Sequence, residues 1–263
     1  MTTFSLKIIA IIAMTVDHFA KILGQSGLLS IFPGMSLSTS YLIINLMEGI
    51  GRIAFPLFAF MIAEGASKTR SLPKYIGRLM LFAVISEPIF YYAFSIQNAS
   101  VEGFFTGLLR LHLTNVFFTL ALGVVAIYIY QMLEKKASKK KLLIFIPALL
   151  FLILFAGYAK CDYGIAGIIL IVALYLANKK TYRTVTIIVW ALGLYIFGQA
   201  FNGFGFNWSQ VTIYAVINCI CAIIPGALIW SYNGKRGKPL KWIFYIYYPA
   251  HLLIFACLSN VLQ

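Results

Sequence analysis

The sequence predicts an all-α integral membrane protein, a polytopic bundle that crosses the bilayer about nine times. Three observations lead to this fold class: 62% of the 263 residues are hydrophobic, only 11% are charged, and apolar runs recur along the whole chain. Soluble domains average roughly 25% charged residues. A chain this apolar cannot cover its hydrophobic side chains with polar ones, so its solvent must be lipid.

A helix needs about 20 apolar residues to cross the hydrocarbon core of a membrane. Nine runs fit that length approximately, and we expect one helix in each. The runs cover residues 5–24, 42–66, 75–96, 113–133, 142–159, 163–178, 184–201, 210–231 and 240–259. Because no internal repeat or low-complexity linker divides residues 1–263, we expect a single transmembrane domain.

Lys and Arg residues gather in alternate loops between these runs and produce the net charge of +14. Loops enriched in Lys and Arg are the cytoplasmic ones in membrane proteins. We therefore expect the N-terminus in the cytoplasm and no binding of nucleic acid. The clusters are Lys68, Arg70, Lys74 and Arg78; Lys135, Lys136, Lys139, Lys140 and Lys141; Lys179, Lys180 and Arg183; and Lys235, Arg236, Lys238 and Lys241.

The first run carries Asp17 and His18 at membrane depth, where an ionisable group costs about 2.5–3.5 kcal/mol and is a functional candidate. Lys7 and His18 are close to three helical turns apart, so they share one face. Asp17 falls on a stripe of small residues that predicts close packing against another helix. It either reaches that helix or pairs with Lys21, four residues later. His18 is either a general base or a satisfied core histidine.

The second run is interrupted around Arg52, which follows Glu48 by four residues and precedes Pro56 by four. Glu48 and Arg52 have the spacing of a helical ion pair. Pro56 cannot donate a hydrogen bond to the carbonyl of Arg52, which predicts a kink. Arg52 either balances Glu48 or holds an anionic group of a substrate. Near the end of the run, Glu64 is spaced to pair with Lys68.

Two further ionisable residues, Glu87 in the third run and His251 in the ninth, stand beside prolines that predict helix breaks, Pro88 and Pro249. Depth can be counted from the basic end of each run at 1.5 Å per residue. On that count His18 lies about 16 Å, Glu87 about 13 Å and His251 about 15 Å into the membrane. Polar groups at similar depth on three helices predict one buried site.

Short blocks of sequence, spread from the first run to the last, show a family resemblance. They are Lys7-Ile8-Ile9, Asp17-His18, Gly51-Arg52, Phe55-Pro56-Leu57-Phe58-Ala59-Phe60, Glu64-Gly65, Asn115, Phe118-Thr119-Leu120, Asp162-Tyr163-Gly164 with Gly167, Phe244-Tyr245, Tyr248-Pro249 and His251-Leu252. Together they resemble the TraX family of membrane acetyltransferases, named for an enzyme that acetylates the N-terminal amine of conjugative pilin. The wider superfamily of transmembrane acyltransferases places a basic residue, then ten residues, then a histidine in the first helix. Lys7 and His18 fit this spacing, with Lys in place of the commoner Arg.

The resemblance implies that acetyl-CoA is the donor, on the cytoplasmic side of a bacterial cell membrane, and that His18 serves catalysis. His18 would be the general base, as histidines near neutral pH often are. Asp17 or Glu87 would orient His18 or the incoming amine. His251 would be a second base or a structural partner.

Binding of the donor is expected to need cations and hydrogen-bond donors. Lys7 would bind a phosphate of acetyl-CoA as a point charge. Arg52, Asn115 or Tyr163 would stabilise the oxyanion that develops on the thioester carbonyl. We expect no metal site, because no pair of the four cysteines has the CxxC spacing of a zinc site.

The acceptor remains open at this level. The expected acceptor is the N-terminal amine of a membrane or exported peptide such as pilin, with membrane lipids surrounding the enzyme. An O-acetyltransferase of an envelope glycan or lipid would use the same chemistry. A proton-coupled transporter would use the buried Asp, Glu and His as a relay, but the sequence lacks the repeat that many transporters show. A purely structural subunit would not explain polar groups at matching depth.

Overall fold

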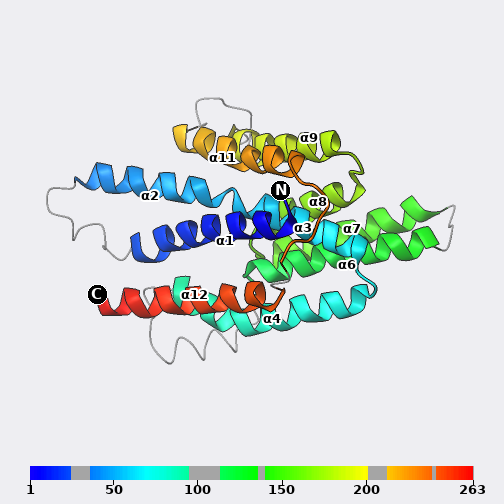
Figure 1. Cartoon of the computed structure of the whole chain (residues 1–263), viewed down its shortest axis with the longest axis horizontal. Coiled ribbons are helices and arrows are strands. Elements are labelled where there is room, and N and C mark those ends of the chain that lie inside the picture. Colours follow the sequence, from blue (N-terminus) through cyan, green and yellow to red (C-terminus); the bar gives the residue numbers. More distant parts are fainter. Residues whose placement is uncertain (25–35, 95–112, 136–139, 201–211, 239–240, 263) are drawn as a thin grey trace.

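The protein is a bundle of helices, seen in a computed structural model that describes residues 1–24, 36–94, 113–135, 140–200, 212–238 and 241–262 (Figure 1). Among these residues there is no strand. A helix satisfies every backbone N–H and C=O within one segment, which is what a chain surrounded by lipid requires. The all-α class predicted from composition is therefore confirmed.

The helices follow the apolar runs closely. The first run forms α1, Thr3–Phe19, which continues as the π-helical turn η1, Ala20–Gly24. The second run forms two helices, α2, Leu37–Gly51, and α3, Ala54–Lys68. The later elements are α4, Leu72–Phe94; α6, Val116–Lys135; α7, Lys141–Tyr158; α8, Gly164–Leu176; α9, Lys180–Ala191, with η4, Leu192–Phe197, and α10, Gly198–Ala200; α11, Ile213–Trp230; and α12, Lys241–Leu262.

Seven segments in the described part of the chain are long and apolar enough to cross a membrane. They are Leu37–Lys68, Leu72–Phe94, Val116–Lys135, Lys141–Tyr158, Lys180–Ala200, Ile213–Trp230 and Trp242–Val261. The two remaining predicted runs correspond to α1, with 17 residues, and α8, with 13. The ends of several runs, and Lys136 and Lys139, lie outside the described residues. The count of nine crossings stays a prediction.

The predicted kink at Arg52 is present as a break between α2 and α3. The amide of Arg52 donates to the carbonyl of Gly49 at 3.0 Å, and that of Ile53 donates to the carbonyl of Ile50 at 3.1 Å. These bonds close tighter turns than those of an α-helix. Pro56, which has no amide hydrogen to donate, follows in the first turn of α3.

The breaks predicted at Pro88 and Pro249 are wrong. Each proline lies inside a continuous helix, Pro88 within α4 and Pro249 within α12. A proline removes one hydrogen bond from the helical ladder, and neighbouring helices in a membrane bundle commonly compensate for that loss. The two helices, α4 and α12, pack against each other.

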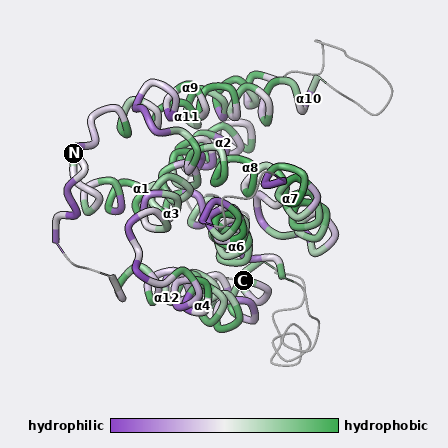
Figure 2. Tube along the Cα trace, turned by 90° about the vertical axis from the view of Figure 1, so that its right-hand side faces the viewer, coloured by the Kyte–Doolittle hydropathy of each residue, from purple (hydrophilic) through white to green (hydrophobic). Residues whose placement is uncertain are grey.

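Helices α1, α3, α6 and α8 occupy the middle of the bundle, with the pair α4 and α12 on one flank and the pair α9 and α11 on another (Figure 2). Glycines allow close contacts between these central helices. A Cβ added to Gly123 of α6 would lie 2.6 Å from Ile171 of α8. One added to Gly167 of α8 would lie 2.6 Å from Thr119 of α6.

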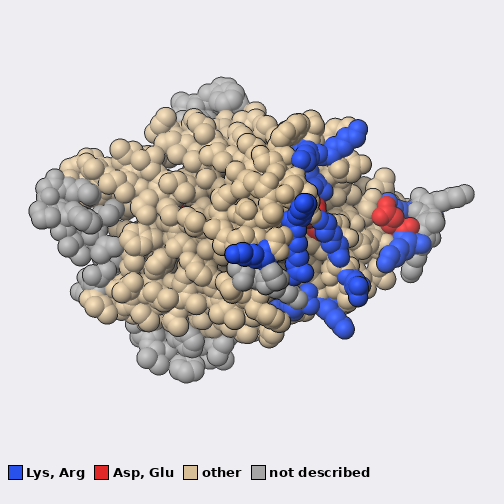
Figure 3. Space-filling model, viewed as in Figure 1, with Lys and Arg blue, Asp and Glu red and all other residues tan. Residues whose placement is uncertain are grey.

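The outward surface is largely apolar, and on the face shown in Figure 3 the Lys and Arg side chains gather toward one end. On α7 the exposed side chains include Leu143, Ile146, Leu150, Phe151 and Leu154, an apolar face that fits lipid. Lys and Arg gather at the end of the bundle where α3 ends and α4 and α9 begin (Figure 3). We call this the basic end. It matches the predicted alternation of charged loops.

Candidate functional site

Two buried histidines from opposite ends of the sequence form a direct pair. His18 Nδ1 lies 2.7 Å from His251 Nε2, although the two residues are 233 apart in the chain. Both side chains are buried, His18 near the end of α1 and His251 in the middle of α12. The predicted agreement in depth therefore brings these two residues into one site.

The hydrogen bonds of this pair assign its protons. His251 Nδ1 lies 2.8 Å from the carbonyl oxygen of Tyr247, which can only accept, so Nδ1 carries the hydrogen. In a neutral ring His251 Nε2 is then bare and accepts from His18 Nδ1. This assignment rests on the bonding network. It leaves His18 Nε2 with a free lone pair, which is the requirement for a general base.

Asp17 lies beside the bare nitrogen. Its Oδ2 is 3.9 Å from His18 Nε2, too far for a hydrogen bond, and 2.7 Å from Lys21 Nζ, so the predicted pairing with Lys21 is confirmed. The close packing predicted for this face is also present, because a Cβ on Gly51 would lie 2.3 Å from the Cβ of Asp17. Asp17 Oδ1 is buried and has no hydrogen-bond partner among the described residues.

Arg52 belongs to the same polar centre, on the side away from the basic end. Its guanidinium is 3.7 Å from Glu48, the predicted ion pair, and interacts electrostatically with Asp17 and with the hydroxyls of Tyr163 and Tyr195. Tyr163 has a left-handed backbone, with φ of 57°, at the start of α8. Its ring stacks on Phe55 with 3.8 Å between ring centroids.

Glu87 fixes the start of α6, and within the described residues its carboxylate bonds Thr114 and Asn115 rather than either histidine. Its two carboxylate oxygens accept from the amide and hydroxyl of Thr114, at 2.9 and 2.5 Å, and from the amide and side-chain nitrogen of Asn115, at 3.1 and 2.6 Å. Asn115 Oδ1 in turn accepts from the amide of Phe117 at 3.0 Å. This arrangement is a helix cap with a carboxylate at the positive end of the helix dipole. The side chains of Glu87 and Asn115 both take part in this cap.

A cavity of about 400 Å³ runs from the basic end toward the histidine pair. On α1 its wall follows successive turns, Thr3, Lys7, Ile11 and Met14, and His18 continues that stripe one turn further. The middle of the cavity is apolar, with Phe58, Met61 and Leu120 among its lining residues. Its inner end is formed by Val116, Phe117 and Tyr248.

Tyr248 separates the cavity from the histidines. Its ring meets His18 edge to face, with 6.0 Å between centroids, and meets His251 at 5.8 Å. Its hydroxyl oxygen is buried and lies beside the backbone amide of Val116. A small group that reached the end of the cavity would therefore touch Tyr248 and lie next to His18.

The outer part of the cavity carries four cations, Lys7, Lys68, Arg78 and Arg236, and one acid, Glu64. Lys7 lies over the ring of Phe244, 4.4 Å from its centroid, and close enough to Arg236 for the two charges to repel. Arg78 Nε has no hydrogen-bond partner in the described part of the chain. Positive groups that face one another with few acids between them form a site for an anion.

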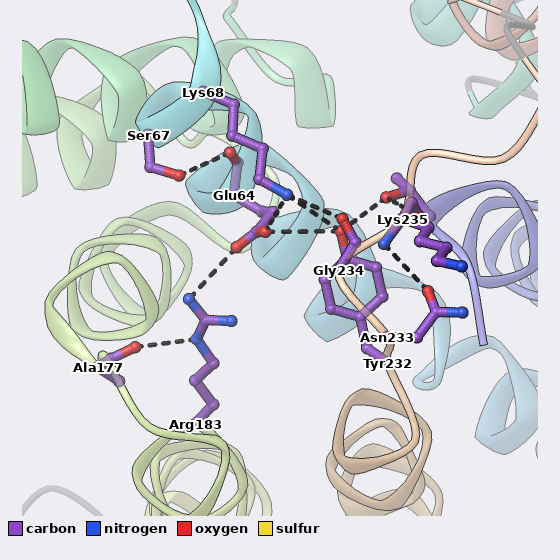
Figure 4. Close-up of polar contacts among 10 residues, drawn as sticks. Glu64, Ser67, Lys68, Ala177, Arg183, Tyr232, Asn233, Gly234 and Lys235 are labelled. Atoms are coloured by element: carbon purple, nitrogen blue, oxygen red, sulfur yellow. Dashed lines mark hydrogen bonds and ion pairs between the residues drawn. The ribbon is translucent and has the colours of Figure 1, made fainter.

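Glu64 forms ion pairs with basic residues at the mouth of the cavity, its outer part (Figure 4). It accepts from Lys68 at 2.7 Å, as its spacing predicted, and also from Arg183 at 3.3 Å. Lys68 continues to the carbonyl of Gly234 at 3.2 Å. The connection that carries Gly234 is also tied to the N-terminus, where the amide of Phe4 donates to the carbonyl of Arg236 at 3.1 Å. These bonds hold Arg236 at the cavity.

The expected donor-binding residues thus fall in two places. Lys7 lines the cavity, whereas Arg52, Asn115 and Tyr163 do not. Sequence reasoning missed Tyr248 as a site residue and treated Arg78 and Arg236 only as markers of orientation. Positive loops occur in every membrane protein of this kind, so nothing in their sequence distinguished the two that line the cavity.

The similarity to known proteins extends over nearly the whole chain. Residues 3–259 match the family described as "TraX protein". A probable fimbrial assembly protein, FimC of serogroup H1 from Dichelobacter nodosus, is 31% identical over 278 aligned residues, which cover 100% of this chain and 97% of the relative. No solved structure matches. Since the match extends over nearly the whole chain, the protein belongs to the TraX family.

Proposed function

We propose that this protein is a membrane-embedded acetyltransferase that moves acetyl from cytoplasmic acetyl-CoA to an amine, with His18 as general base. The observation that carries the proposal is the cavity: cationic at its mouth, apolar along its length, and ending on the tyrosine that packs against the His18–His251 pair. The matched family and the fimbrial assembly relative support a role connected with pilin.

The cavity suits the chemistry of an acyl-CoA. The phosphates of acetyl-CoA cannot enter lipid, and Lys7, Lys68, Arg78 and Arg236 offer them cations at the basic end. From Thr3 to Met14 the wall on α1 rises about 16 Å at 1.5 Å per residue, room for an extended, uncharged arm. The thioester then lies at Tyr248, next to His18. This proposal places the basic end, and with it the N-terminus, on the cytoplasmic side.

The histidine pair supplies the base. The lone pair of His18 Nε2 takes a proton from the acceptor nitrogen, while His251 holds the opposite nitrogen of the ring in its protonated form. The positive imidazolium that results is stabilised by the Asp17 carboxylate, 3.9 Å from Nε2. Asp17 Oδ1, which has no partner among the described residues, accepts a hydrogen bond from the incoming amine.

The acceptor we propose is the N-terminal amine of a membrane or exported peptide such as a pilin subunit. An N-terminal amine has a pKa of about 8, against about 10.4 for lysine, so a histidine can more readily deprotonate it. A carboxylate beside the base attracts the ammonium form of that amine, whereas a neutral hydroxyl gains less from it.

The test is transfer of labelled acetyl from acetyl-CoA in membranes that contain the wild type, His18→Ala or Tyr175→Phe. We expect His18→Ala to lower transfer by about 10²–10⁴-fold, the usual contribution of a general base. Tyr175→Phe is the control, because the hydroxyl of Tyr175 accepts a hydrogen bond from Gln131 at 2.9 Å and Tyr175 does not line the cavity. Identification of the labelled product then assigns the acceptor.

Three results would decide against parts of this proposal. Wild-type membranes that transfer no acetyl above empty membranes would reject the enzyme, and a proton-coupled transporter would be tested next. Full transfer by correctly folded His18→Ala would reject the base. A labelled glycan or lipid in place of a peptide would replace the amine acceptor by a hydroxyl.

A further inference from the structure

One helical turn before the histidine pair, a second contact joins the same two helices. Thr15 precedes His18 by three residues in α1, so the two share a helix face. Tyr247 precedes His251 by four residues in α12 and shares its face. Thr15 Oγ1 and the Tyr247 hydroxyl are 2.7 Å apart, although the residues are 232 apart in the chain. We call this contact the Thr15–Tyr247 tether.

The hydrogen bonds of the tether have one consistent direction. Thr15 Oγ1 lies 2.8 Å from the carbonyl oxygen of Ile11, which can only accept, so the Thr15 hydroxyl donates there. The oxygen of Thr15 is then the acceptor for the Tyr247 hydroxyl. Both hydroxyl hydrogens are used in this way, and the phenol ring of Tyr247 is held against α1.

Tyr247 contacts His251 in two ways. Its carbonyl oxygen accepts from His251 Nδ1 at 2.8 Å. Its ring lies nearly parallel to the imidazole, with 5.0 Å between centroids and 11° between planes. Phe255, one turn later, meets the same imidazole edge to face at 5.8 Å. The His251 ring is therefore held between two aromatic side chains of its own helix, one of which is bonded to α1.

His18 receives this constraint through its bond to His251. The two imidazole planes differ by 11°, and their centroids are 5.0 Å apart. With 2.7 Å between His18 Nδ1 and His251 Nε2, this is the geometry of two rings joined edge to edge by a hydrogen bond. A rotation of the His251 ring would bend that bond and weaken it. The orientation of His18 therefore depends on that of His251.

We propose that Thr15 and Tyr247 are positioning residues of the base. They hold His251 in one tautomer and orientation, and through it they keep the hydrogen of His18 on Nδ1 and the lone pair on Nε2. This inference rests on the proposed function, in which that lone pair takes the proton. Neutral histidine in water prefers its hydrogen on Nε2, so the site has to impose the opposite tautomer through the hydrogen bonds of the rings.

The hydrogen-bonded network of the pair ends inside the protein. His251 Nδ1 donates to a backbone carbonyl, which cannot take up and pass on a proton. The proton that His18 Nε2 takes from the acceptor nitrogen, as the C–N bond forms, therefore leaves on the CoA thiolate when the C–S bond breaks. A proton-coupled transporter would instead need a chain of groups that both accept and donate.

The first test records the tautomers. The chain has three histidines, His18, His251 and His112, the last of which lies outside the described residues. Protein labelled with ¹⁵N in histidine therefore gives few nitrogen signals, and each is assigned by its loss in a histidine variant. In alkaline buffer, where histidine is neutral, we expect both His18 and His251 of the wild type to carry hydrogen on Nδ1 and none on Nε2.

Thr15→Val and Tyr247→Phe each remove the tether while they keep the size of the side chain. In both variants we expect a second population with the hydrogen of His18 on Nε2. Thr186→Val is the matched control, because the Thr186 hydroxyl makes the same bond to the carbonyl four residues earlier, that of Tyr182, at 2.8 Å. It should show the wild-type signals.

The second test measures catalysis. We expect Thr15→Val and Tyr247→Phe each to lower kcat by about 10- to 100-fold, the effect of a small misplacement of a catalytic group. KM for acetyl-CoA should stay unchanged, because neither Thr15 nor Tyr247 lines the cavity. The double variant should lose no more than either single variant, since both changes remove the same bond. Thr15→Ser keeps the hydroxyl and should restore both kcat and the wild-type nitrogen signals.

The outcomes separate this inference from the proposed function. Wild-type nitrogen signals and full kcat in both tether variants would overturn the inference and leave the acetyltransferase in place. A loss of kcat with unchanged signals, or one that Thr15→Ser does not reverse, would overturn it as well, since the loss would not come through the tautomer of His18. A wild type that transfers no acetyl would reject the proposed function and, with it, the role of the tether in catalysis. Altered tautomers and lowered kcat in folded variants, both reversed by Thr15→Ser, support the inference.

Discussion

Asp17 and Gly51 show how a single position sets the geometry of the polar centre. Asp17 is placed beside His18 only because the residue opposite it, at the end of α2, has no side chain. The gap leaves the carboxylate free to bond Lys21 on its own helix while it faces the base. A methyl group at residue 51 would displace both.

We expect Gly51→Ala to destabilise the protein by about 1–3 kcal/mol, the usual cost of overpacking. The added Cβ would lie 2.3 Å from the Cβ of Asp17 and 2.6 Å from its carboxyl carbon, so α1 and α2 would have to separate. Gly77→Ala in α4 is the control, because an added Cβ there has no atom within 4 Å. Thermal unfolding in detergent measures both. Equal midpoints for the two variants would contradict the close approach.

Whether a contact between two residues could be predicted depends on their separation in the chain. The pairs Asp17–Lys21, Glu48–Arg52 and Glu64–Lys68 are confirmed, because a helix places residues four apart on one face. The contact between His18 and His251 was predicted only as a shared depth. Which nitrogen atoms of the two rings meet depends on how α12 packs against α1. The sequence around either histidine does not determine that packing.

Among the elements, α6 is the one whose start determines most of the site. It opens at Val116, inside the bundle, and the carboxylate of Glu87 in α4 holds the two residues before it. The same turn forms the inner end of the cavity. Glu87 therefore acts on the position of α6, although its sequence context suggested a role beside His18.

The variant Glu87→Gln distinguishes these two roles. A glutamine amide has one accepting oxygen where the carboxylate has two, and its NH₂ would face the donors of Thr114 or Asn115. We expect a loss of about 1.5–3 kcal/mol in stability, the usual contribution of hydrogen bonds to a charged group. Glu134→Gln is the control, since Glu134 is half-exposed and its ion pair with Lys141, at 3.3 Å, is a surface pair.

If Glu87 instead oriented His18 directly, Glu87→Gln would unfold at the wild-type temperature and lose acetyl transfer. Circular dichroism melts, combined with transfer per folded molecule, separate the two cases.

The elements themselves could be predicted well where composition alone decides them. Apolar runs in lipid must be helices, and a proline after a charged pair broke the second run as expected. Pro88 and Pro249 did not break theirs, because the packing around a proline decides whether a helix continues. The packing of α4 against α12 is not visible in the sequence of either run.

For the molecule as a whole, the position of the Lys and Arg side chains and the position of the cavity both favour entry of acetyl-CoA from the basic end. The Lys and Arg side chains gather at one end, and the cavity opens among four of them. From there the apolar part of the cavity leads to the proposed base, His18, which is buried about half the thickness of a membrane from the basic end. Alternating loop charge predicted the basic end from sequence, but the cavity depends on gaps between α1, α3, α4, α6 and α12 that arise only when the bundle assembles.

The most direct measurement is equilibrium binding of labelled acetyl-CoA to purified protein in lipid nanodiscs, for the wild type and for Met61→Trp. Met61 lines the middle of the cavity, so a tryptophan there would block the path of the pantetheine arm and leave the basic mouth intact. We expect the wild type to bind acetyl-CoA at one site, with an affinity that salt weakens, and Met61→Trp to lose that binding while it stays folded. Equal binding by the two proteins, or none by the wild type, would contradict a donor site in this cavity.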